Sequence, residues 1–104
     1  MENRERSQEI AQTILEQLGG NKFRAMTGAH SFMSKEAGLV FKFPNGKNRI
    51  FALEVNLRPD DTYEMKFFKK KGRYNVEVAK EYQGVYCDML QSLFTDETGL
   101  DTRL

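Results

Sequence analysis

The segment from Leu39 to Phe67 constrains the fold most, because its apolar residues recur at every second position. This period places them on one face of an extended strand. The turn-forming sequences PNGK and RPDD divide the segment into three runs. The alternating residues are Leu39, Phe41 and Phe43 in the first run, Phe51, Leu53, Val55 and Leu57 in the second, and Tyr63, Met65 and Phe67 in the third. The pattern predicts three consecutive antiparallel strands that share one apolar face.

Further strands are predicted on both sides of this segment. After KKKG, the residues Tyr74, Val76 and Val78 continue the apolar stripe, so Lys69 to Gly72 are expected at a hairpin tip. Before it, the segment KFRAMTGAHSFMS predicts a strand that breaks or bulges at Gly28. The sheet therefore has four or five strands, mostly antiparallel and in meander order.

Apolar residues at helical spacing flank the meander. Ser7 is expected to cap a first helix that ends at Gly19 and Gly20, and a second helix is expected between Val85 and Phe94, with a stop at Gly99. The apolar face of the first helix consists of Ile10, Ala11, Ile14, Leu15 and Leu18. These elements predict one α+β domain over residues 7–104, preceded by a charged leader at residues 1–6, with both helices on one face of the sheet.

The charge balance and the termini restrict the class of protein. The chain has 104 residues with 16 basic and 15 acidic side chains, and a formal net charge of +1 is too small to mark the whole surface as a polyanion or membrane binder. One cysteine, Cys87, cannot form an internal disulfide, and MENRERSQEI lacks the apolar run of a secretory signal. We expect a cytoplasmic protein with no membrane partner.

The sheet face away from the helices is the first candidate for a functional surface. It is expected to carry Lys42, Glu54, Asn56, Glu64, Lys66, Asn75 and Glu77, with Val40, Ile50, Ala52 and Phe68 among them. Ile50, Ala52 and Phe68 predict an apolar patch for a partner protein or for a second copy in a homodimer. Acidic residues of the last helix, Asp88, Asp96 and Glu97, extend this predicted protein interface.

The stretch FFKKKGRY supports an alternative in which the chain binds nucleic acid. The candidate contacts to a polyanion are Lys66, Lys69, Lys70, Lys71 and Arg73, with Phe68 available to stack on a base. The competing structural interpretation is that solvated lysines protect a hairpin tip from edge pairing. Because one basic turn at nearly zero net charge predicts weak and salt-dependent affinity, binding of a protein partner is preferred.

The residues that carry enzyme chemistry are few. The chain has one histidine, His30, and one cysteine, Cys87, and it lacks the common nucleophile, zinc and phosphate-binding motifs. Cys87 falls on or near the apolar stripe of the last helix, where a buried thiol is common. In TGAHSF, Gly28 allows either a bulge or the close approach of a ligand to His30 and Ser31. The sequence predicts no catalytic residue, metal or cofactor, and an enzyme of unknown class is the third alternative.

Three segments carry a resemblance to other proteins. QLGGNKFRAMTGAHSF, DDTYEMKF and GVYCDMLQSLFTDETGLDTRL are similar to segments of a group of short proteins from bacterial phages, plasmids and integrated mobile elements. They span most of the chain but contain no catalytic motif, and no activity is assigned to the group. The resemblance implies an accessory protein of a mobile element that acts on nucleic acid or on host proteins, which is consistent with counter-defence.

Overall fold

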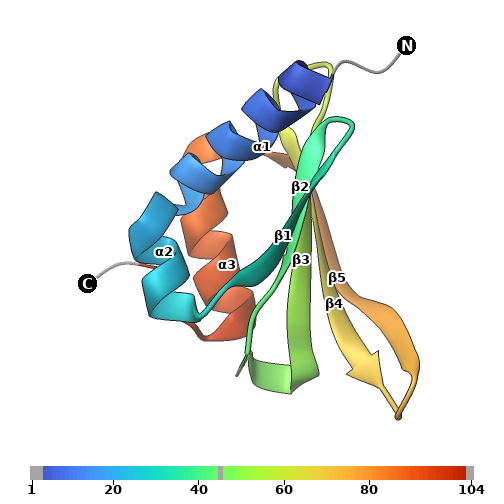
Figure 1. Ribbon diagram of the computed structural model, residues 1–104. Coiled ribbons are helices and arrows are strands. Elements are labelled where there is room, and N and C mark those ends of the chain that lie inside the picture. Colours follow the sequence, from blue (N-terminus) through green and yellow to red (C-terminus); the bar gives the residue numbers. More distant parts are fainter. Residues whose placement is uncertain (1–3, 45, 103–104) are drawn as a thin grey trace.

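The computed structural model describes residues 4–44 and 46–102 (Figure 1). In chain order the elements are α1 (Arg4–Leu18), α2 (Gly20–Thr27), β1 (His30–Lys35), β2 (Gly38–Lys42), the 3-10 turn η1 (Lys47–Arg49), β3 (Ile50–Leu57), β4 (Tyr63–Lys71), β5 (Asn75–Val85), the 3-10 turn η2 (Cys87–Met89) and α3 (Leu90–Thr98). The strands form one five-stranded antiparallel sheet in the order β1-β2-β3-β4-β5. The predicted α+β meander is confirmed.

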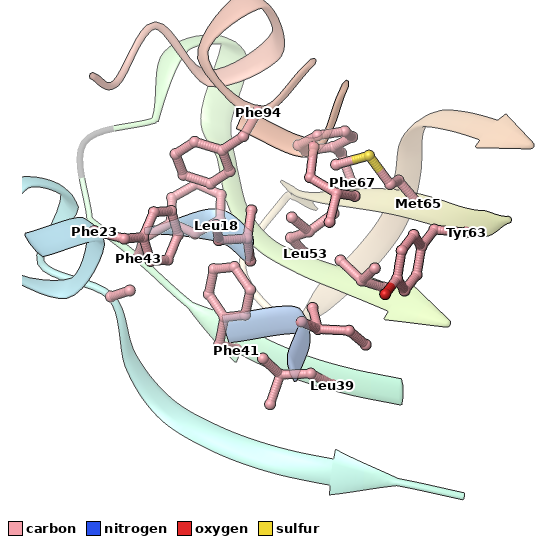
Figure 2. Close-up of a cluster of buried hydrophobic side chains, with 14 of the residues drawn as sticks. Leu18, Phe23, Leu39, Phe41, Phe43, Leu53, Tyr63, Met65, Phe67 and Phe94 are labelled. Carbon is pink, nitrogen blue, oxygen red and sulfur yellow. The ribbon is translucent and has the colours of Figure 1, made fainter. Parts of the chain in front are cut away.

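The hydrophobic core lies between the sheet and the three α-helices, which all cover the same sheet face (Figure 1). Aromatic rings from both layers meet at its centre (Figure 2), where the ring of Phe94 lies 5.1 Å from those of Phe23 and Phe43, edge to face. Leu53 and Phe67 of the central strands are fully buried beside them. This packing leaves the second face of the sheet without a helical layer.

The predicted strand over residues 22–34 is wrong in its first half, because residues 20–27 form helix α2. Phe23 and Thr27 are buried one helical turn apart, and Thr27 Oγ1 donates a hydrogen bond to the Phe23 carbonyl over 2.7 Å. Gly28 adopts the left-handed conformation, with φ of 73°, and its N–H bonds the Arg24 carbonyl. Gly28 is therefore a helix C-cap rather than a strand bulge.

The N-terminal helix begins at Arg4, within the segment that was predicted as a leader. Ser7 therefore lies inside the helix and is not its N-cap. The Ser7 side chain is buried, and its Oγ donates a hydrogen bond to the Glu36 carbonyl over 2.9 Å. This bond holds α1 against the turn between β1 and β2.

Two bulges in β5 correct the predicted apolar stripe. Phe67 pairs with Lys80 and Phe68 with Val78, so Ala79 is an extra residue in the strand, and a second register shift follows between Met65 and Tyr63. The extra residue reverses the side-chain alternation. Val76 and Val78 consequently share the face of Phe68 and remain 54% and 50% exposed, instead of joining the core.

The three lysines of the basic stretch do not form the hairpin tip, whereas Gly72 and Arg73 do. Strand β4 continues to Lys71, and the chain reverses over residues 72–74, where Gly72 has φ of 71°. Lys69, Lys70 and Lys71 are therefore strand residues whose side chains alternate between the two faces of the hairpin.

The last helix starts later than predicted, because β5 extends to Val85 and Cys87 lies in η2. The Cys87 side chain is exposed, so its predicted buried position on the apolar stripe is wrong. The predicted stop at Gly99 is confirmed, since its N–H bonds the Thr95 carbonyl over 2.8 Å. None of the helices in the described residues is long and apolar enough to cross a membrane.

Candidate functional site

The sheet face opposite the helices, here called the open face, is organised in rows by the strand register. One row contains Val40, Glu54, Lys66 and Glu81, and the next contains Lys42, Ala52, Phe68 and Val78. The first row lies nearer the turn between β3 and β4, and the second lies nearer the turn at Gly72. The open face therefore has a charged end and an apolar end.

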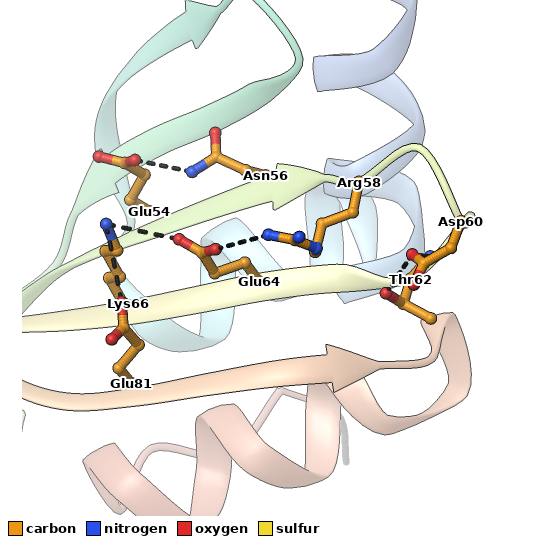
Figure 3. A network of polar contacts seen from close by, with 8 residues as sticks. All are labelled: Glu54, Asn56, Arg58, Asp60, Thr62, Glu64, Lys66 and Glu81. Atoms are coloured by element: carbon orange, nitrogen blue, oxygen red, sulfur yellow. Dashed lines mark hydrogen bonds and ion pairs between the residues drawn. The ribbon is translucent and has the colours of Figure 1, made fainter.

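At the charged end, side chains of opposite charge are paired with one another (Figure 3). Glu64 accepts a hydrogen bond from Arg58 Nη1 over 3.2 Å and lies 3.4 Å from Lys66 Nζ, which also lies 3.7 Å from Glu81. The hydrogen bond and charge of Glu64, with the charge of Glu81, raise the pKa of Lys66. Pairs of this kind at a surface stabilise the fold little, and here they leave the charged end locally neutral.

At the apolar end, Ala52 is buried, Phe68 is half-buried, and Val76 and Val78 keep about half of their surface in solvent. Because β5 is an edge strand, these two valines lie at the margin of the sheet. The positions predicted for Ala52 and Phe68 on the open face are consistent with the register. The two valines extend the predicted patch toward the edge of the sheet.

Three residues predicted for the open face lie elsewhere. A register shift between Ile50 and Ala52 turns Ile50 toward the core, where only 4% of it is exposed. Glu77 and Asn75 pair with Lys69 and Lys71, on the side opposite to Phe68 and Val78. Both corrections have the same cause, because a bulge reverses the alternation of every residue beyond it.

Most cations of the basic stretch already have carboxylate neighbours. Lys69 and Lys71 lie 3.2 and 3.6 Å from Glu77, whose pKa is lowered chiefly by the hydrogen bond from Lys69. Lys66 is paired at the charged end, as described above. Lys70 differs, since its Nζ lies over the ring of Phe51 at 5.5 Å from the centroid. A polyanion bound to this hairpin would meet carboxylates as well as ammonium groups.

The acidic residues of the predicted protein interface lie on the side of the molecule that carries the helices. Asp88 and Asp96 line a polar pocket of about 400 Å³ beside α3. Glu97 instead accepts a hydrogen bond from the hydroxyl of Tyr82, and this bond raises the pKa of Tyr82 to about 12. The predicted interface residues are therefore divided between two surfaces.

The structure does not assemble a catalytic group from the residues considered above. His30 is exposed, with Nδ1 2.9 Å from Ser31 Oγ, and Cys87 is exposed in η2. Asp60 has a structural role, because it accepts hydrogen bonds from the backbone and hydroxyl of Thr62, which lower its pKa. In residues 4–44 and 46–102, no group of three or more His, Cys, Asp or Glu side chains is placed to hold a metal ion.

The sequence interpretation missed a pocket next to the apolar end of the open face. The pocket has a volume of about 370 Å³ and is lined by Arg49, Ile50, Phe51, Lys70 and Gly72. Phe51 was predicted as a core residue, and Arg49 was not considered. Their convergence depends on the pairing of β3 with β4, for which the local sequence contains no signal.

Comparison with protein-family models, with curated proteins and with solved structures gives no match for this chain. The open face and the pocket beside it are therefore the candidate functional surface.

Proposed function

We propose that this protein acts by binding a partner protein, without catalysis, through the apolar end of its open face. The observation that carries the proposal is the alignment of Phe68 with Val76 and Val78, two valines that stay half exposed at the edge of the sheet. Single apolar residues are common on protein surfaces, whereas a contiguous group marks an interaction site. Covering these side chains would remove apolar area from water and would favour association.

The charge distribution supports a protein partner over a nucleic acid. Three of the five predicted polyanion contacts, Lys66, Lys69 and Lys71, have carboxylates within 4 Å. Binding phosphates there would disrupt these pairs or bring phosphate close to Glu77 and Glu81. The resemblance of three segments to mobile-element proteins supports the setting that we propose, a cytoplasmic accessory protein that acts on a host protein in counter-defence.

Quantitative affinity purification from bacterial cells tests the proposal. We expect Phe68→Glu and Val78→Glu each to reduce recovery of the bound partner by more than about tenfold, because each places an unpaired charge in the contact. Gln83→Glu is the matched control, since Gln83 is an exposed residue of the same strand outside the patch. Circular dichroism establishes that each variant is folded.

Recovery of the same partner by Phe68→Glu, Val78→Glu and the wild type would contradict the proposal. Sedimentation velocity on the purified chain tests the case in which the partner is a second copy. A dimer that dissociates in Val78→Glu and persists in Gln83→Glu would assign the open face to self-association.

A further inference from the structure

We infer that the partner places a carboxylate side chain in the pocket lined by Arg49, Ile50, Phe51, Lys70 and Gly72, here called the basic pocket. The inference rests on the proposed function and specifies the chemistry of the partner. Its basis is the convergence of an arginine, a lysine and an aromatic ring beside the apolar end of the open face.

Strand register brings the two cations together. Ile50 pairs with Lys69 in the antiparallel β3–β4 ladder. Arg49, the last residue of η1, precedes Ile50, and Lys70 follows Lys69 in β4, so both basic residues adjoin this pair. Both side chains are exposed and line the same pocket. The pocket therefore lies where the η1 turn meets the paired strands β3 and β4.

The turn that carries Arg49 has an unfavourable backbone conformation. Asn48 and Arg49 have φ of 57° and 65°, in the left-handed region that residues with a Cβ rarely adopt. Asparagine tolerates this region better than arginine does. Strain of this kind persists where surrounding structure holds it, and it is often found at binding sites. Here the strained turn carries Arg49 at the pocket that Lys70 also lines.

The two cations lack the carboxylate neighbours of the other lysines in β4. Within the described part of the chain, neither Arg49 nor Lys70 forms an ion pair, whereas Lys66, Lys69 and Lys71 each do. The ammonium of Lys70 lies over the ring of Phe51, and Arg49 is the second basic residue that lines the pocket. An incoming anion would meet two cations whose charges are not already neutralised.

A carboxylate from a protein fits this environment better than a chain of phosphates. Arginine binds a carboxylate through two parallel N–H donors, and a lysine beside it adds a point charge. Phe51 and Phe68, which are both half-buried, offer apolar surface to residues that flank the acidic one. A nucleic-acid strand that followed the open face would carry further phosphates toward Glu54 and Glu81 at its charged end. The partner segment is therefore an acidic residue between apolar residues.

An NMR titration of the ¹⁵N-labelled chain tests the inference without the partner. The probe is the capped tripeptide acetyl-Val-Glu-Val-amide, and the matched control is acetyl-Val-Gln-Val-amide. We expect the glutamate peptide to shift the amide signals of Arg49, Phe51, Lys70 and Gly72 and to bind at least about fivefold more tightly than the glutamine peptide. The double variant Arg49→Gln, Lys70→Gln should lose this preference, and Lys71→Gln should retain it.

Equal affinity for the two peptides, or shifts confined to other residues, would overturn the inference. Inorganic phosphate is titrated in parallel, and tighter binding of phosphate than of the glutamate peptide at the same signals would overturn the assignment to a carboxylate.

Failure of this inference can be distinguished from failure of the proposed function. If Val78→Glu loses the partner in the affinity purification but the two peptides bind equally in the titration, the open face remains the docking surface. Only the assignment of the basic pocket is then refuted. If the glutamate peptide binds more tightly but Val78→Glu recovers as much partner as the wild type, the anion site is retained and the docking face is refuted.

Discussion

At the scale of single residues, two tyrosine hydroxyls connect the sheet to the helices. Tyr63 donates to Gln17 Oε1 of α1 over 2.8 Å, and Tyr82 donates to Glu97 of α3. Burial is the main cause that raises the pKa of Tyr63, whereas the hydrogen bond to Glu97 is the main cause for Tyr82. Both contacts join residues that are distant in sequence, so the sequence alone indicated neither of them.

The variant Glu97→Gln tests the contact between β5 and α3. Loss of the carboxylate should lower the pKa of Tyr82 from about 12 toward its ordinary value of 10.0, as measured by tyrosinate absorbance with Tyr82→Phe as the reference. Because this pKa is raised in the folded state, the contact stabilises the wild type fully below the ordinary pKa and less as the pH rises toward 12. A pKa that stays near 12 in Glu97→Gln would show that another group raises it.

Gly38 provides a test of backbone packing between β2 and β3. A Cβ at this position would collide with the Val55 carbonyl and with the side chain of Asn56. We expect Gly38→Ala to lower the free energy of unfolding by about 3 kcal/mol in urea denaturation, since the opposing carbonyl belongs to the backbone. Gly72→Ala is the control, because its Cβ would meet open space and only the positive φ is strained, at about 1 kcal/mol. Equal losses would mean that β2 moves to accommodate the methyl group.

At the scale of elements, the alternating pattern was sufficient for the strands whose one face is buried. It correctly predicted the inward-facing residues up to Met65 and Phe67 in β4, because every second residue there is buried in the core. It failed in β5, where one extra residue at Ala79 reverses the alternation without any change in composition. The second bulge in β5, between Tyr82 and Val85, could have been predicted from Gly84, a glycine inside the strand with φ of 65°. In α2, burial of Phe23 against the sheet outweighed the weak strand pattern.

A pair of alanine variants tests the reversed alternation in β5. Leu53→Ala should lower the free energy of unfolding by about 3 kcal/mol, because Leu53 is fully buried in the central strand. Val78→Ala should change it by less than about 0.5 kcal/mol, because half of this side chain is already in water. Urea denaturation measures both values. A loss above about 1.5 kcal/mol in Val78→Ala would indicate that the valine is buried, because removal of two buried methyl groups costs on the order of this amount.

At the scale of the whole molecule, three helices on one face of a five-stranded sheet determine where a partner can bind. The sequence predicted two of these helices on one face of a four- or five-stranded sheet, and it predicted Ala52 and Phe68 for the open face. It did not separate the charged end from the apolar end, because that division follows from the register of four strands. Lys70 was predicted only as a polyanion contact, and its position in one pocket with Arg49 was missed for the same reason. The 20 residues between them in the sequence are folded back by strand pairing.

The neutralised lysines lead to a prediction about nucleic acid. In fluorescence anisotropy with labelled single- and double-stranded DNA and RNA at two salt concentrations, we expect only weak binding at low salt, with little change in the variant Lys69→Ala, Lys70→Ala, Lys71→Ala. The reason is that two of the three lysines already share Glu77. Tight binding that is sensitive to salt and lost in the variant would instead make β4 a polyanion contact.

The central claim is that a protein partner covers the apolar end of the open face. Site-specific photo-crosslinking in cells tests it most directly, with benzoylphenylalanine introduced in place of Val78 or, as the control, in place of Gln83 on the same strand. Our account predicts a cross-linked adduct of one defined mass at position 78 and little or none at position 83. Equal adducts at both positions, or an adduct at position 83 alone, would contradict it.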